Sequence, residues 1–152
     1  MRLGVLAALA AMACGRSATG PEAAAVRVTD AVTAVAAHRL APTADAVGQL
    51  EVTVTLTNRT AARAEVALLD PAPFVIRLYP EGHDDVPVNA ARDGTRLPRL
   101  VSLAPGATDT LRDAVRRDRL RDLGAARGRF RVVAVLTTGA PVEVPAGEIV
   151  LP

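Results

Sequence analysis

The chain has 152 residues, half of them hydrophobic, and its 18 basic and 16 acidic residues leave a formal net charge of only +2. The 18 basic residues are all arginines with acids interleaved among them, so the composition excludes the concentrated basic face that nucleic-acid binding requires. The single cysteine excludes an internal disulfide. This length fits one domain stabilised by an apolar core.

The first thirteen residues have the organisation of a signal peptide. Arg2 supplies a positive start, Leu3 to Met12 form an apolar run, and Ala11-Met12-Ala13 matches a small-residue cleavage site. The run is too short for a membrane span, which needs about 20 apolar residues. The sequence Ala11-Met12-Ala13-Cys14 resembles the lipobox of bacterial lipoproteins, in which cleavage occurs just before a cysteine that carries a diacylglycerol. The resemblance implies lipidation at Cys14, whereas ordinary secretion would leave a free thiol there.

Cleavage before Cys14 divides the chain into three parts. They are a signal peptide over 1–13, a lipidated cysteine with a flexible tether over 14–25, and a single β-sandwich domain over 26–152. The tether is rich in small and breaker residues, a composition typical of flexible linkers. Gly15 after the cysteine resembles the sorting pattern of outer-membrane lipoproteins. We therefore expect an exported lipoprotein of the bacterial cell envelope, anchored in the outer membrane.

Three segments alternate between hydrophobic and polar residues with the period of a half-buried strand: 49–57, 74–79 and 129–137. Weaker strand patterns, separated by turn signals, cover 26–35, 65–69, 100–103, 108–113 and 148–151. The alternation assigns to the core Leu50, Val52, Val54, Leu56, Phe74, Ile76, Leu78, Phe130, Val132, Ala134 and Leu136. About seven to nine short strands in a chain of this length favour an all-β fold, an antiparallel immunoglobulin-like β-sandwich.

One segment, 114–123, breaks the β pattern. Its few hydrophobic residues stand among arginines and aspartates, and Gly124 is placed where a helix would stop. We expect a short helical crossover here, supported by an ion pair between Asp113 and Arg117 at i,i+4 spacing. The arginines of this segment are interpreted as a solvated face balanced by acids, in preference to a binding patch.

The search for catalytic motifs finds none in the sequence. Ser102 lacks the glycine elbow of hydrolases, and His38 and His83 stand far apart in unrelated contexts. The polar cluster over 81–85 lacks the regular spacing of calcium ligands and is predicted to be an exposed turn rather than a metal site. We expect no enzymatic activity, no metal and no cofactor.

A set of short motifs follows the strands in a fixed order. Asn58-Arg59-Thr60 comes after the first clear strand, then Phe74-Val75-Ile76, Leu103-Ala104-Pro105-Gly106, and finally Gly128-Arg129-Phe130-Arg131-Val132. This order is similar to that of the bacterial intracellular proteinase inhibitor (BsuPI-like) family, over roughly 49–137. The resemblance implies an immunoglobulin-like or fibronectin-III-like sandwich, and inhibition of a proteinase as one possible activity. The Asn-x-Thr motif is interpreted as a turn rather than as a glycosylation site.

Two functions remain for the domain. The first is a non-catalytic protein-interaction module, held by the lipid anchor at the membrane and near a protein partner in the envelope. The alternative is a proteinase inhibitor whose exposed loop around 80–98 enters a protease cleft, with Arg92 or Arg96 in an acidic specificity pocket. The few aromatic residues argue against stacking platforms for nucleic acid, and Tyr79 is interpreted as a surface residue or a strand-end anchor. No small-molecule substrate is evident.

Overall fold

The computed structural model describes residues 24–69, 72, 74–91 and 98–152. Cys14, Arg92 and Arg96, the residues singled out from the sequence for anchoring and interaction, lie outside these ranges. The described elements are, in chain order, β1 (Val26–Arg27), β2 (Val32–Ala41), β3 (Gln49–Asn58), β4 (Ala64–Leu68), β5 (Val75–Pro80), β6 (Val88–Ala90), β7 (Arg99–Leu103), β8 (Thr108–Arg116), α1 (Arg117–Asp122), β9 (Gly128–Leu136) and β10 (Val142–Leu151).

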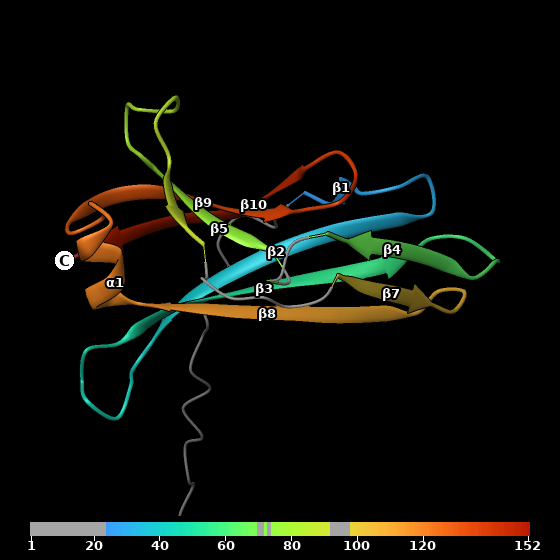
Figure 1. Ribbon diagram of the computed structural model, residues 1–152, viewed down its shortest axis with the longest axis horizontal. Helices are drawn as coiled ribbons and strands as arrows, with labels where there is room; N and C mark the ends of the chain where they lie inside the picture. Colours follow the sequence, from blue (N-terminus) through green and yellow to red (C-terminus); the bar gives the residue numbers. More distant parts are fainter. Residues whose placement is uncertain (1–23, 70–71, 73, 92–97) are drawn as a thin grey trace, which may run out of the picture.

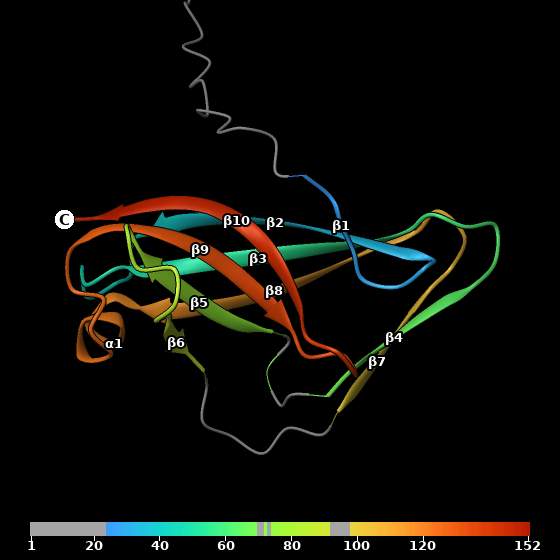
Figure 2. The ribbon, with the colours of Figure 1, turned by 90° about the horizontal axis from the view of Figure 1, so that it is seen from above.

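Two four-stranded antiparallel sheets pack face to face around the core (Figure 1, Figure 2). One sheet has the order β1-β2-β3-β8 and the other β10-β9-β5-β6. A two-stranded ribbon of β4 and β7 lies at one end of the molecule, and α1 lies at the opposite end (Figure 1). Early strands pair with late ones, β3 with β8 and β5 with β9, as in immunoglobulin-like sandwiches. The predicted all-β antiparallel sandwich is confirmed.

The described residues form ten strands, where the sequence predicts about seven to nine. The predicted strand over 26–35 is divided into β1 and β2, because the hydroxyl of Thr29 accepts hydrogen bonds from the amides of Ala31 at 3.2 Å and Val32 at 3.1 Å. Hydrogen bonds from nearby amides to a hydroxyl oxygen close a turn of this kind. The other additional strand is β6, which pairs with β5 inside the region predicted to be a loop.

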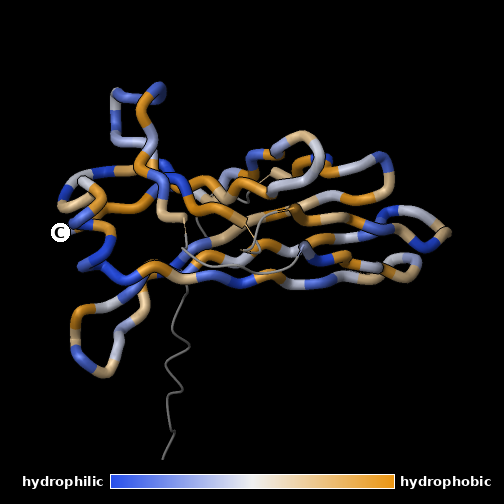
Figure 3. The backbone as a smooth tube through the Cα atoms, in the orientation of Figure 1, coloured by the Kyte–Doolittle hydropathy of each residue, from blue (hydrophilic) through white to orange (hydrophobic). Residues whose placement is uncertain are grey.

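The alternation in the sequence determines which face of each strand is buried. Every residue that it assigns to the core has no more than 3% of its surface exposed. Figure 3 shows this alternation as hydrophobic and hydrophilic residues along the strands. Burial of apolar surface contributes roughly 25 cal/mol per Å². Since the chain has only one cysteine, this packing holds the two sheets together without an internal disulfide.

Asn58 closes the turn after β3 and is 1% exposed. Its side-chain nitrogen lies 2.7 Å from the carbonyl oxygen of Ala62, 3.1 Å from that of Leu103 and 3.0 Å from that of Ala104. Its side-chain oxygen accepts hydrogen bonds from the amide and the hydroxyl of Thr60. The Asn58 amide is therefore committed to internal bonds, which agrees with its interpretation as a turn residue.

The helical crossover is shorter than the predicted 114–123. β8 continues to Arg116, because the strand alternation buries Leu111, Asp113 and Val115 in turn. α1 therefore begins at Arg117 and has six residues. Asp113 lies in a strand, so the predicted helical ion pair of Asp113 with Arg117 is wrong. Among the residues that the structure describes, no helix is long and apolar enough to cross a membrane.

The end of α1 is where the sequence places it. Gly124 has a φ of +98°, a conformation that favours glycine. Its amide donates to the carbonyl of Arg121 at 3.0 Å, and the amide of Ala125 donates to the carbonyl of Leu120 at 2.8 Å. These two bonds form a Schellman motif. Leu120 and Ala125 are both buried, so the motif fixes the turn after α1 against the core.

Candidate functional site

The predicted interaction loop around 80–98 is described only in part. β5 ends at Pro80, a largely exposed turn follows over 81–87, and β6 occupies the next three residues. Because Arg92 and Arg96 lie outside the described residues, their role in the loop stays a prediction.

The polar cluster over 81–85 forms ion pairs with β9. Asp84 Oδ1 lies 2.9 Å from Arg131 Nη2, and Glu81 Oε1 lies 3.9 Å from Arg129 Nε. In the described ranges, no group of three His, Cys, Asp or Glu side chains is placed to hold a metal ion. The cluster is an exposed turn, as the sequence predicts.

Tyr79 stabilises the outer face of the second sheet. It is 7% exposed and packs with Val133 and Val135 in a small cluster separate from the main core. Its hydroxyl donates to Glu143 Oε1 at 3.0 Å, and the guanidinium of Arg131 lies 4.4 Å from the ring centroid, within the range of a cation–π contact. Of its two predicted roles, Tyr79 has that of the strand-end anchor.

A hollow of about 620 Å³, which we call the α1 hollow, lies at the end of the sandwich that carries α1. The loop before β3, α1, the turn after it and the last residues of β10 contribute to its lining. Buried apolar residues, among them Leu120 and Leu151, lie at its floor. The more exposed lining side chains include Arg117, Arg121 and Arg127. Its volume is within the range of ligand pockets, about 300–1,000 Å³.

Main-chain contacts fix α1 beside this hollow. The amide of Arg117 donates to the carbonyl of Gly48 at 3.1 Å, which joins α1 to the loop before β3. The side chain of Arg117 also donates from Nη2 to the main-chain oxygen of Pro152 at 3.2 Å. Gly48 has a φ of +80°, and a Cβ there would lie only 3.4 Å from Arg117 Cδ. Since 3.4 Å is close to an ordinary van der Waals contact, the positive φ is the main reason for glycine at this position.

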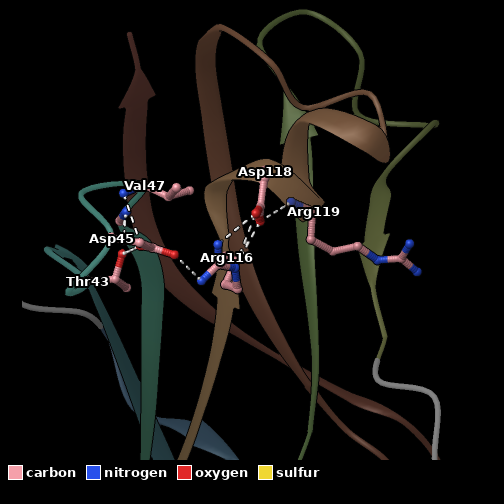
Figure 4. A network of polar contacts seen from close by, with 7 residues as sticks. Thr43, Asp45, Val47, Arg116, Asp118 and Arg119 are labelled. Carbon is pink, nitrogen blue, oxygen red and sulfur yellow. Dashed lines mark hydrogen bonds and ion pairs between the residues drawn. The ribbon is translucent and has the colours of Figure 1, made fainter.

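Arg116 links the loop before β3 to α1 (Figure 4). Its Nη1 lies 2.8 Å from Asp45 Oδ2, and its Nη2 lies 2.8 Å from Asp118 Oδ2. Asp45 also accepts a hydrogen bond from the hydroxyl of Thr43, and Asp118 accepts one from the amide of Arg119 at 2.7 Å. The side chain of Arg119 itself points away from this network (Figure 4).

These bonds favour the charged form of every member of the network. The hydrogen bond from Thr43, followed by that from Arg116, lowers the pKa of Asp45 to about 2. The hydrogen bond from Arg116, followed by that from the amide of Arg119, also lowers the pKa of Asp118. Asp118 and then Asp45 raise the pKa of Arg116 in return. At neutral pH, two carboxylates therefore compensate the charge of Arg116.

Arg117, Arg121 and Arg127 are not compensated in this way. Within the part of the chain that the structure describes, no Asp or Glu side-chain oxygen lies within 4.0 Å of their guanidinium nitrogens. Asp118 also lines the hollow, but it is bound to Arg116. The side chains that line the α1 hollow therefore carry an excess of positive charge.

Of the four acids expected to balance these arginines, three are engaged elsewhere, and the fourth, Asp122, is exposed on α1, outside the lining of the hollow and farther than 4.0 Å from any described guanidinium. Asp109 pairs with Arg99 at 2.9 Å, Asp113 is buried in β8, and Asp118 pairs with Arg116. Direct ion pairs of the predicted kind therefore form at Arg116, whereas Arg117, Arg121 and Arg127 have, of these four acids, only the Asp122 carboxylate on α1, which is unpaired among the described residues.

A second hollow, of about 580 Å³, lies over β2, β3 and β8. It is lined by small and charged residues that include Ala37, Arg39, Glu51, Thr53, Arg112 and Ala114. Gln49 and Arg39 both donate hydrogen bonds to Glu51 and lower its pKa, Gln49 having the larger effect. Since Arg39 and Glu51 neutralise one another, this hollow has less excess charge than the α1 hollow.

The α1 hollow is suited to hold an anionic group. A guanidinium stays protonated at neutral pH and donates two parallel N–H bonds to a carboxylate or a phosphate. A buried apolar floor lowers the local dielectric constant and strengthens such bonds. The arrangement therefore provides binding and orientation of an anion.

A scan against protein-family models and a search of curated proteins find no match to the chain. Among solved structures, the chain is similar to the X-ray structure of Northeast Structural Genomics Consortium target SoR45, with a TM-score of 0.41 and 8% sequence identity. The match covers 82% of this chain and 88% of the other. The site is accordingly interpreted from its own geometry.

The sequence pattern does not predict the α1 hollow, although it contains the arginines of α1. One usable signal was the alternation over 108–113, which continues to Val115 and so places Asp113 in a strand. A second was Gly124, which reverses the chain after α1. That reversal brings Arg127 to the same hollow as Arg121. Hydrophobic periodicity does not predict that these two residues are close together.

Proposed function

We propose that the protein is a lipid-anchored module of the bacterial cell envelope that binds a protein partner without catalysing a reaction, and that the partner docks on the α1 hollow. The observation that carries the proposal is the set of three guanidinium groups, of Arg117, Arg121 and Arg127, that line one hollow with no Asp or Glu carboxylate within 4.0 Å among the described residues. Arg117 donates to an oxygen of Pro152, so Arg121 and Arg127 are the two left to meet a partner. Complementary charge supplied by a partner steers its approach and fixes its orientation. A lipid at Cys14 would keep this surface close to partners in the same envelope.

The position of the arginines supports binding because little has to be ordered when a partner arrives. Arg116 ties α1 to Asp45, and the Schellman motif at Gly124 fixes the turn that precedes Arg127. A surface that is already ordered loses less conformational entropy on association. The α1 hollow therefore has the support that a specific docking surface needs.

Crosslinking in intact envelopes, followed by purification of the full-length protein, tests the proposal. The double variant Arg121→Gln/Arg127→Gln removes two charges that line the α1 hollow and leaves the core unchanged. The matched control Arg112→Gln/Arg119→Gln removes two exposed arginines that do not line it. We expect the first variant to lose its crosslinked partner and the control to retain it. Equal recovery of the partner from both variants would place the docking surface elsewhere.

The alternative function, a proteinase inhibitor that acts through the loop around 80–98, depends on Arg92 and Arg96, which lie outside the described residues. Titration of trypsin-like and subtilisin-like proteases with the full-length protein separates the two functions. We expect no inhibition. Inhibition at a near-stoichiometric ratio that Arg92→Ala or Arg96→Ala abolishes would favour the inhibitor instead.

A further inference from the structure

We infer that the α1 hollow binds an acidic peptide segment, one that presents at least two carboxylates a few residues apart. This inference rests on the proposed function and adds the chemistry of the partner's docking segment. It is based on the distribution of the arginines, the contacts that guanidinium groups already make at this end of the molecule, and the nature of the floor.

The arginines of the α1 hollow come from two separate segments. Arg117 and Arg121 are four residues apart on α1, a spacing that puts two side chains on the same face of a helix about 5–6 Å apart. Arg127 follows the turn at Gly124 and lines the hollow from a different stretch of chain. Positive charges distributed along a surface in this way match several anionic groups in a row.

Guanidinium groups at this end of the sandwich already bind the two kinds of oxygen that an acidic peptide offers. Arg116 bridges the carboxylates of Asp45 and Asp118, at 2.8 Å to each (Figure 4). Arg117 donates to a main-chain oxygen, that of Pro152, at 3.2 Å. A bound peptide would add carboxylates for Arg121 and Arg127, which have no acidic partner among the described residues.

The floor of the hollow favours a peptide that alternates acidic and aliphatic residues. Leu120, Ala125 and Leu151 form its buried base and are at most 3% exposed. The accessible apolar surface of the floor comes from Val47, Ala126 and Pro152, which are half-buried or exposed. A volume of about 620 Å³ is large enough for more than one side chain. Aliphatic side chains would cover this floor while the neighbouring carboxylates reach the arginines.

Fluorescence anisotropy with the full-length protein in a non-ionic detergent tests this inference. The probe is a labelled peptide of alternating Glu and Leu, and the matched peptide has Gln in place of Glu. We expect the acidic probe to bind and the Gln peptide to bind much more weakly. Binding of the acidic probe should weaken as the salt concentration rises from about 0.1 M to about 1 M, because the Debye length falls from about 10 Å to about 3 Å.

Three single variants locate the binding. Arg121→Gln and Arg127→Gln should each weaken the acidic probe by about tenfold, the effect of losing one charge-assisted hydrogen bond. Arg119→Gln removes the same charge from α1 but from a side chain that does not line the hollow, and it should leave the affinity nearly unchanged. Equal weakening by all three variants would mean non-specific attraction and would overturn the inference.

Competition distinguishes carboxylates from phosphate. Inorganic phosphate and dihexanoylphosphatidylglycerol, each at the concentration of unlabelled acidic peptide that displaces the probe, should leave the probe bound. Displacement by either would identify a phosphate site and contradict the inference. If the acidic probe does not bind but Arg121→Gln/Arg127→Gln still loses its crosslinked partner, the inference fails and the proposed function stands. If that double variant keeps its partner, the proposed function fails.

Discussion

The ring of His38 on β2 donates a hydrogen bond from Nδ1 to the main-chain oxygen of Ala146 on β10 at 2.7 Å, and so connects the two sheets along one edge of the sandwich. The next residue, Gly147, lies at a β-bulge where the register of β10 against β9 shifts. Gly147 has a φ of +106°, and a Cβ there would lie 3.2 Å from His38 Cε1. Glycine is therefore required both by the backbone conformation and by the close approach of the imidazole.

Gly147→Ala should lower the free energy of unfolding by about 2 kcal/mol, because it combines an unfavourable positive φ with a steric contact. In the His38→Ala background the contact is absent, so Gly147→Ala should cost less there than in the wild type. Urea unfolding of the four proteins in this double-mutant cycle measures the coupling. Gly139→Ala is the control, since a Cβ at Gly139 would meet nothing within 4 Å. Full additivity of the two substitutions would contradict the contact.

Asn58→Asp should destabilise the fold by about 3 kcal/mol or more, because a buried carboxylate oxygen would face the three carbonyl oxygens that now surround the two N–H groups of the Asn58 amide. Asn89→Asp is the matched control. Asn89 is exposed, and its Oδ1 accepts a hydrogen bond from Arg77, so a carboxylate keeps that contact. Thermal unfolding should show a large loss for the first variant and almost none for the second. Similar melting temperatures would mean that the amide bonds of Asn58 are not required.

Acid should weaken the link between Asp45 and Arg116. The pKa of Asp45 is lowered to about 2 in the folded protein, so its ionisation stabilises the fold above the pKa of the unfolded state and this contribution is lost as the pH falls from about 4 to about 2. Asp45→Asn should therefore reduce the loss of melting temperature over this interval. Asp122→Asn, on the exposed side of α1, serves as the control. An unchanged acid profile in Asp45→Asn would contradict the pKa shift.

If Cys14 carries the proposed lipid anchor, Cys14→Ser should move the protein from the membrane fraction to the soluble periplasm or the medium, because the substitution removes the thiol to which the lipid would be attached. Labelled fatty acid should be incorporated into the wild type and not into the variant. Two or more acyl chains are needed for stable anchoring, so the wild type should stay in the membrane fraction after a salt wash. A soluble, unlabelled wild type would contradict the proposed lipid anchor.

Much of the fold could be predicted because one face of each central strand is buried. The alternation at Leu50 to Leu56 leaves only one register, since a slip by one residue would expose every core side chain of β3. The end of α1 at Gly124 could also be predicted, because a positive φ is favourable for glycine and does not depend on contacts with distant segments.

The candidate site could not be predicted in the same way, because it depends on contacts between distant segments. Arg116 forms ion pairs with Asp118 and with Asp45 from the loop before β3. The ion pair with Arg116 is the reason that Asp118 does not compensate the arginines of the α1 hollow, and the sequence does not contain this information. The i,i+4 spacing of Asp113 and Arg117 is compatible with a helix, but Asp113 is buried in strand β8 and therefore does not belong to α1.

A photo-crosslinking residue placed at three surface positions of the full-length protein in intact envelopes tests the docking surface most directly. Ala126 lines the α1 hollow, Thr55 lies on the outer face of β3, and Glu65 lies on the ribbon at the opposite end. We expect a crosslinked protein partner from position 126 and none from position 65 or 55. Crosslinking from position 55 or 65, with none from position 126, would contradict it.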